Sequence, residues 1–103
     1  MAYTGTSAKQ IEYAASVHPR LVARYEGLVA EWREGGCTAQ EVAGAKRVLE
    51  AARDLSDARV ILDLANVSSD DDNAVFLVAL GYEEGPGLGI GKYAMVAAKS
   101  LLD

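Results

Sequence analysis

The sequence predicts an all-α protein, a compact bundle of five or six short helices in one domain. Apolar residues recur at spacings of three, four and seven, which is the period of a helix buried on one side. Serine, threonine or aspartate precedes several of these stretches and glycine follows them, as at helix ends. Residues 74–80 are apolar on every side, so we expect them in the middle of the core.

Length and composition set the scale of the molecule. A chain of 103 residues, half of them hydrophobic, forms one domain with a conventional core. A single cysteine, Cys37, excludes an intramolecular disulfide. We find no leader segment and no apolar run near the roughly 20 residues of a membrane helix, so we expect a soluble protein in a reducing, cytoplasmic compartment.

Charge is unevenly distributed along the chain. Residues 1–59 carry eight basic and eight acidic side chains, whereas residues 60–103 carry two lysines and seven acids, so the net charge of −5 belongs to the last part. An acidic surface keeps a protein in solution or attracts a basic partner. The expected acidic surface consists of Asp70, Asp71, Asp72, Glu83 and Glu84.

Two helices are predicted over residues 8–17 and 19–34. His18 and Pro19 are expected to separate them, because the residue before a proline avoids helical backbone angles. Proline is favoured in the first turn of a new helix, where its missing N–H leaves no helical hydrogen bond unmade. A pair of glycines after residue 34 marks the end of the second helix.

The second of these helices has the most regular apolar stripe. Tyr25 and Trp32 lie on it seven residues apart. Both are expected in the core, and they become binding anchors if the stripe is only partly covered. A homodimer that buries part of the stripe is a hypothesis based on the same pattern. Arg20 and Arg24 are expected on the exposed side.

A capping box predicts the next helix, since Thr38 and Glu41 have the Ser/Thr-x-x-Glu spacing. This helix extends to about residue 54 and forms an antiparallel hairpin with the helix before it. Ser56 is expected to cap a further helix that extends to about residue 66. Its β-branched residues leave a short strand open as the alternative.

The last third contains two more predicted helices and a glycine-rich loop. A serine or aspartate of residues 68–72 caps the first helix. Residues 85–91 contain four glycines and a proline, which no regular element tolerates. The last helix, over about residues 92–102, is expected to bury Tyr93, Val96, Ala97 and Leu101, with a strand at its start as the alternative.

The glycine-rich loop suggests a phosphate site, but the pattern is incomplete. Tyr93 follows Gly91 and Lys92 where a Walker A loop has serine or threonine, and Pro86 replaces its first glycine. We therefore predict a connector or a loop that contacts a partner, with an anion site at the following helix as the lesser alternative. The predicted binding residues here are Tyr82, Gly87, Gly89, Gly91, Lys92 and Tyr93.

No pattern indicates catalysis, a metal or a cofactor. The acidic run lacks the central glycine and the ligand ladder of a calcium loop, so helix capping is its expected role. One histidine, His18, and one cysteine are too few for a structural zinc site. They also lack a signature for the orienting group of a nucleophilic pair. We predict a protein that is not an enzyme and has no catalytic residue.

Two short motifs resemble a small helical module. Residues 7–14, Ser-Ala-Lys-Gln-Ile-Glu-Tyr-Ala, are similar to an opening of the form Ser/Thr-x-Lys-Gln-x-x-Tyr/Phe. Residues 55–64 resemble a closing segment that ends in Ile/Leu-Asp-x-Leu, although an Arg-Val pair replaces two small residues. Such modules occur in bacterial and phage proteins, often beside enzymes of DNA metabolism. The resemblance implies an α-helical accessory module and carries over no catalytic residue.

The sequence thus predicts a regulatory module that binds another protein, or itself, through an apolar helix face and residues 82–93. An inhibitor from a phage or bacterium that presents its acidic side chains as surrogate phosphates fits this hypothesis. One alternative is an accessory domain of nucleic-acid metabolism that uses Arg20, Arg24 and Arg33, although the absence of a basic patch disfavours direct binding of nucleic acid. The other is a binder of a small anion at the glycine-rich loop. No membrane partner is expected.

Overall fold

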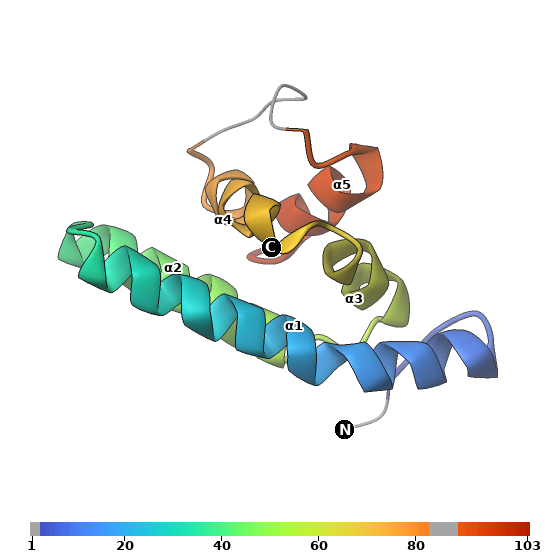
Figure 1. Ribbon diagram of the computed structural model, residues 1–103. Coiled ribbons are helices and arrows are strands. Elements are labelled where there is room, and N and C mark those ends of the chain that lie inside the picture. Colours follow the sequence, from blue (N-terminus) through green and yellow to red (C-terminus); the bar gives the residue numbers. More distant parts are fainter. Residues whose placement is uncertain (1–2, 83–88) are drawn as a thin grey trace.

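The fold is all-α, as the sequence predicts, and the computed structural model describes it over residues 3–82 and 89–103 (Figure 1). Within these ranges the only β pairing is an isolated bridge, so the alternative strands near residues 60 and 92 are not formed. The helices are α1 (Ala8–Glu34), α2 (Ala39–Arg53), α3 (Ala58–Ala65), the 3-10 helix η1 (Ser69–Asp71), α4 (Asp72–Ala79) and α5 (Lys92–Ser100). None of these described helices is long and apolar enough to cross a membrane.

The helices α1 and α2 form the predicted antiparallel hairpin (Figure 1). The turn between them requires a left-handed backbone at Gly36, where φ is 88°, a conformation that residues with a Cβ rarely adopt. Both bonds of the predicted capping box are formed. Thr38 Oγ1 accepts from the Glu41 N–H at 3.1 Å, and Glu41 Oε1 accepts from the Thr38 N–H at 2.8 Å. Neighbouring residues alone therefore determine where α2 begins.

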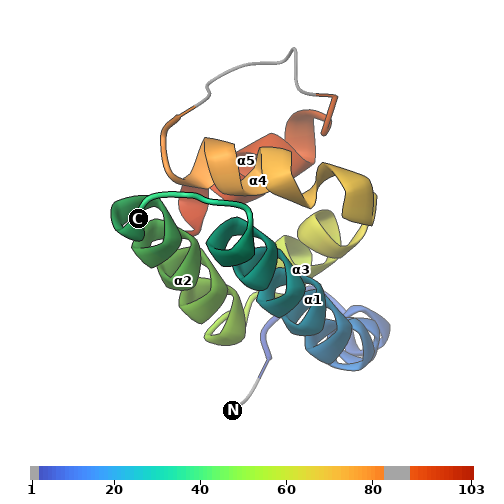
Figure 2. The same ribbon diagram turned by 60° about the vertical axis from the view of Figure 1, so that its left-hand side comes forward.

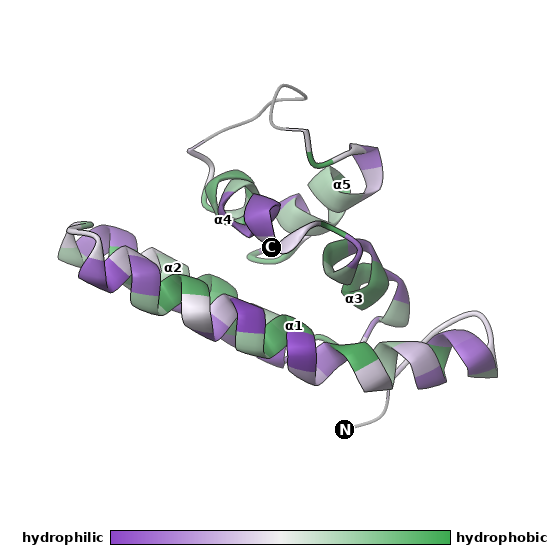
Figure 3. Ribbon diagram, viewed as in Figure 1, coloured by the Kyte–Doolittle hydropathy of each residue, from purple (hydrophilic) through white to green (hydrophobic). Residues whose placement is uncertain are grey.

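The remaining helices lie across the hairpin as a second layer (Figure 2). The helix α3 packs against α1, α4 contacts both α1 and α2, and α5 rests on α3 and α4. Phe76 of α4 is fully buried, and its ring lies against Tyr25 and Trp32 at centroid distances of 4.9 and 5.8 Å. Figure 3 shows that hydrophilic residues in α4 are confined to its start, in agreement with the predicted central place of this segment.

The predicted break at His18 and Pro19 is wrong, because α1 continues through both residues. The missing proline N–H leaves the Ala15 carbonyl without its helical partner, but Pro19 and Ala15 both lie on the exposed side, where the carbonyl is open to water. The apolar stripe continues past the proline through Val17 and Leu21, which are both buried. Packing of this stripe offsets the cost of an interior proline, which is about 3 kcal/mol in an isolated helix.

The start of α3 also differs from the prediction, since its N-cap is Asp57 instead of Ser56. Asp57 Oδ1 accepts a hydrogen bond from the Arg59 N–H at 2.9 Å. The Ser56 carbonyl accepts from the Thr4 N–H at 2.8 Å, and the Ala58 N–H donates to the Thr4 carbonyl at 2.7 Å. Ser56 therefore attaches the chain before α1 to the start of α3.

The helix α5 buries Ala97 and Leu101 as predicted, but the other two residues expected in the core are exposed. Tyr93 and Val96, which were expected in the core, are 64% and 63% exposed. The buried side carries small residues followed by a leucine at helical spacing, namely Ala94, Ala97, Ala98 and Leu101. Because the distance between packed helices depends on the side chains at their contact, the alanine side permits the closer approach, and Tyr93 and Val96 face solvent.

Candidate functional site

The predicted binding residues separate into one core position and two surfaces. Tyr25 is fully buried against Phe76, so a partner does not reach it. Trp32 and Tyr82 lie far apart in the sequence, yet they line one cavity at the end of the hairpin. The other predicted binding residues that the structure describes lie around the start of α5.

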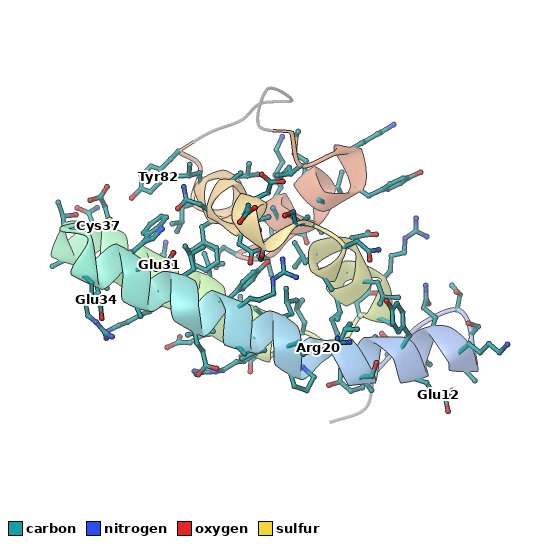
Figure 4. All side chains as sticks on the ribbon, in the orientation of Figure 1. Glu12, Arg20, Glu31, Glu34, Cys37 and Tyr82 are labelled. Atoms are coloured by element: carbon teal, nitrogen blue, oxygen red, sulfur yellow. The ribbon has the colours of Figure 1, made fainter. Side chains whose placement is uncertain are left out.

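The cavity that contains Trp32 and Tyr82 is here named the hairpin-tip groove. It has a volume of about 400 Å³ and lies between the last turns of α1, the start of α2 and the helix α4. Figure 4 shows Glu31, Cys37 and Tyr82 at this end of the molecule. The groove is lined by Leu28, Glu31, Trp32, Cys37, Glu41, Asn73, Leu77 and Tyr82.

Trp32 is held in a defined orientation within the groove. Its indole Nε1–H donates a hydrogen bond to Asn73 Oδ1 at 2.7 Å, and its ring meets the edge of Phe76. The side chain is nevertheless only partly buried. An aromatic ring that is fixed on one side and open on the other is a ready contact for a partner.

The rim of the groove is aromatic and acidic. Tyr82 is 52% exposed, and its N–H donates to the Leu77 carbonyl at 2.9 Å after a left-handed turn at Gly81. Glu31 is exposed, whereas the Glu41 carboxylate takes part in the capping box. The described residues that line the groove include these two glutamates and no lysine or arginine. The groove thus combines apolar and aromatic surface with negative charge.

The second surface lies at the start of α5. Gly91, Lys92 and Tyr93 line a hollow of about 210 Å³ together with Asp63 of α3. The Arg59 guanidinium lies 5.5 Å from the centroid of the Tyr93 ring, a cation–π contact. A carboxylate in the same hollow opposes the binding of an anion, so the geometry gives no support to the predicted anion site.

Two residues expected on the surface instead form an ion pair between helices, in which Asp72 is buried and Arg24 is partly buried. Arg24 Nε–H donates to Asp72 Oδ2 at 2.9 Å, and one of its terminal nitrogens donates to Oδ1 at 2.6 Å. The guanidinium also donates to the carbonyls of Ala65 and Val67, at 3.1 and 2.7 Å. Asp72 is only 3% exposed. This pair connects α1 to the end of α3 and the start of α4, and it removes Asp72 from the acidic surface and Arg24 from the predicted basic one.

The helical spacing of α4 could have indicated that Asp72 is buried. Asp72 lies three and four residues before Val75 and Phe76, both of which are buried, so it shares their side of α4. Burial raises the pKa of the Asp72 carboxyl above its usual value, and the hydrogen bonds from Arg24 oppose that shift. The run of three aspartates suggested helix capping and so hid the single buried member.

The other predicted acidic residues and loop glycines that the structure describes do not line the hairpin-tip groove. Asp70 is exposed and Asp71 is partly buried, and both belong to η1, which Ser68 caps through a 3.3 Å hydrogen bond to the Asp70 N–H. Gly89 is exposed. Three predicted residues lie outside the described ranges: Glu83, Glu84 and Gly87.

His18 and Cys37 do not meet. His18 is buried, with Nε2 2.7 Å from the Ala52 carbonyl and Nδ1 2.8 Å from the Tyr3 hydroxyl. About 24 Å of helix, at about 1.5 Å per residue, separates it from the end of α1, beyond which Cys37 lies. Across residues 3–82 and 89–103, no three His, Cys, Asp or Glu side chains are grouped so as to hold a metal ion.

Comparisons with models of protein families, with curated proteins and with solved structures found no match to the chain. The proposals that follow therefore depend on the geometry of the chain itself. Of the two surfaces, only the hairpin-tip groove combines a preformed cavity with a fixed tryptophan.

Proposed function

We propose that the protein is a non-enzymatic interaction module whose hairpin-tip groove binds a segment of a protein partner. The observation that supports this function best is the position of Trp32. Its ring is fixed by Asn73 and Phe76, yet it remains accessible in a cavity of about 400 Å³. Tryptophan and tyrosine carry a large share of binding energy in protein interfaces, and Tyr82 stands at the same rim.

The lining defines the chemistry of the partner. Leu28, Leu77 and the two aromatic rings offer apolar contacts, so the partner inserts an apolar side chain. Glu31 is exposed at the edge and attracts a lysine or arginine that flanks the inserted residue. The hydrogen bond to Asn73 already orders the Trp32 ring, so binding loses little side-chain entropy there.

Selection of a random peptide library on the immobilised protein tests this function. We expect the selected peptides to share an apolar residue flanked by lysine or arginine. The chain offers two built-in reporters, because its only tryptophan and its only cysteine both line the groove. Peptide binding is therefore expected to shift the Trp32 emission and to slow the reaction of Cys37 with a thiol reagent.

A charge-reversal pair provides the matched control. Glu31→Lys is expected to weaken binding of the selected peptides at least tenfold, by repelling their basic residues. Glu12→Lys makes the same change at the opposite end of α1 (Figure 4) and is expected to leave binding unchanged. Peptides without basic residues, or equal binding to both variants, would contradict the proposed function.

A further inference from the structure

The exposed side of α5 is apolar at its centre and basic at both ends. Tyr93 and Val96 lie three residues apart and are each more than three-fifths exposed. Lys92 and Lys99 are exposed on either side of them, about 10 Å apart along the helix. These four residues are here named the α5 face. The helix contains no acidic residue.

The charge of the α5 face is opposite to that of its surroundings in the sequence. Lys92 and Lys99 are the only basic residues among residues 60–103, which otherwise carry seven acids. Arg59 of α3 adds a third positive charge next to the Tyr93 ring, although Asp63 lies 3.8 Å from the same guanidinium. An apolar centre flanked by lysines is the chemistry that the hairpin-tip groove requires of its partner.

The groove and the α5 face of one copy do not reach each other. The helix α5 turns its alanine side to α3 and α4, so the α5 face points away from the core. Tyr93 shares its hollow with residues of α3, whereas the groove lies between α4 and the tip of the hairpin. Contact between the two surfaces therefore requires two copies of the chain.

We propose that the α5 face of one copy docks in the hairpin-tip groove of a second copy. This inference rests on the proposed function, because it identifies one occupant of that groove. Val96 and Tyr93 insert beside Trp32, and a lysine of the α5 face pairs with Glu31. The two surfaces are different, so a copy that docks through one of them alone leaves one groove and one α5 face free. Such head-to-tail contacts build open chains or closed rings, whereas two copies that dock in each other's grooves form a closed dimer.

The contact involves one short helix and one small cavity, which places it among small, weak interfaces. Self-association is therefore expected to depend on concentration and to decrease with salt, which screens the lysine–glutamate attraction. A partner whose basic and apolar segment binds the groove more tightly displaces the α5 face from it. The α5 face of another copy and the segment of a partner thus compete for the same hairpin-tip groove.

Light scattering on the full chain and on two variants tests this proposal. Glu31→Lys blocks the groove and Val96→Glu blocks the α5 face, and both positions are exposed, so the fold is expected to persist. The average mass of the unmodified protein is expected to at least double between about 10 µM and about 1 mM, the range of a weak contact. Each variant alone is expected to stay monomeric. Their equimolar mixture is expected to form a dimer and nothing larger, because only one functional groove and one functional α5 face meet.

A monomeric unmodified protein at about 1 mM, or continued association of Val96→Glu, would overturn the proposal. An equimolar mixture of the two variants that stays monomeric would also overturn the proposal. The proposed function is judged separately, since Val96→Glu keeps its groove. If Val96→Glu binds the selected peptides while no self-association occurs, only the head-to-tail contact is wrong. If Glu31→Lys binds those peptides as well as the unmodified protein does, the proposed function itself is wrong.

Discussion

Tyr25 and Trp32 stand seven residues apart on one stripe of α1, and both contact Phe76, yet Tyr25 is fully buried and Trp32 is open to solvent. The difference lies in what the second layer places beside each ring. Near Tyr25, the ion pair of Arg24 and Asp72 closes the interface between α1 and α4. Near Trp32, the chain has turned away at the end of α4, and a cavity remains.

This comparison teaches that an apolar stripe does not by itself separate a core from a binding surface. The opposing helix makes that distinction, residue by residue. We therefore expect changes near Tyr25 to affect mainly the free energy of unfolding, and changes near Trp32 to affect mainly binding. The variants below test this division at positions of decreasing expected effect.

Phe76→Ala is expected to have the largest effect, because Phe76 supports both aromatic rings. Truncation of a fully buried phenylalanine lowers the free energy of unfolding by about 4 kcal/mol, from lost burial and from the cavity left behind. The Trp32 emission is expected to change as well, since its ring loses a contact. Urea unfolding followed by circular dichroism measures the loss of stability, and fluorescence measures the change in the Trp32 emission.

Leu77→Ala is the matched control for Phe76→Ala. Leu77 is the next residue of α4, but it lines the groove and is only partly buried. Its truncation is expected to cost well under half as much stability, while weakening the binding of selected peptides. An equal loss of stability in both variants would mean that the end of α4 belongs to the core and not to a site.

Arg24→Met is expected to have the next largest effect, about 3 kcal/mol at pH 7, because it leaves the Asp72 carboxylate buried without its partner. Burial already raises the pKa of Asp72, and loss of the opposing arginine raises that pKa further. With the folded pKa above the unfolded one, the folded state of the variant is stabilised by proton uptake at low pH, and this is lost as the pH rises through the folded pKa. The deficit relative to the unmodified protein is therefore expected to be smaller at pH 4 than at pH 7.

A double variant isolates the carboxylate. Arg24→Met combined with Asp72→Asn has no titrating group at this position, so its stability relative to Arg24→Met is expected to rise as the pH rises from 4 to 7. Urea unfolding at both pH values provides the measurement. A deficit of Arg24→Met that does not change with pH would show that the Asp72 carboxylate is hydrated in the folded state, which contradicts its burial.

The parts of the fold that the sequence predicted well depend on neighbouring residues. The capping box of Thr38 and Glu41 and the glycine turn before it involve only a few adjacent positions, and α2 begins where they predict. The continuation of α1 through Pro19 could not be predicted in the same way. A local rule favours a break there, and only packing of the stripe on both sides of the proline overrides it.

The groove and the ion pair were hidden for a similar reason. Arg24 and Asp72 are 48 residues apart, and each has an ordinary explanation in its own segment. Trp32 and Tyr82 were both predicted as binding residues, but nothing in the sequence placed them in one cavity. In α5, Tyr93 and Val96 were predicted in the core together with Ala97 and Leu101. Only the latter two are buried, because the helix turns further toward its alanines and also buries Ala94 and Ala98.

The smallest expected effects compare the two aromatic positions directly, by removing the polar group of each ring, together with part of the ring in the case of Trp32. The Tyr25 hydroxyl is buried and makes no hydrogen bond within the described residues, so Tyr25→Phe relieves an unsatisfied group and is expected to raise the free energy of unfolding by about 1 kcal/mol. Trp32→Phe instead removes an N–H that donates to Asn73, and a loss of about 1 kcal/mol is expected. Thermal and urea unfolding of both variants measure the expected gain in the free energy of unfolding for Tyr25→Phe and the expected loss for Trp32→Phe. A loss of stability in Tyr25→Phe would contradict the comparison. The Tyr25 hydroxyl would then have a buried water or another partner, and the middle of α1 would be less tightly closed than its burial indicates.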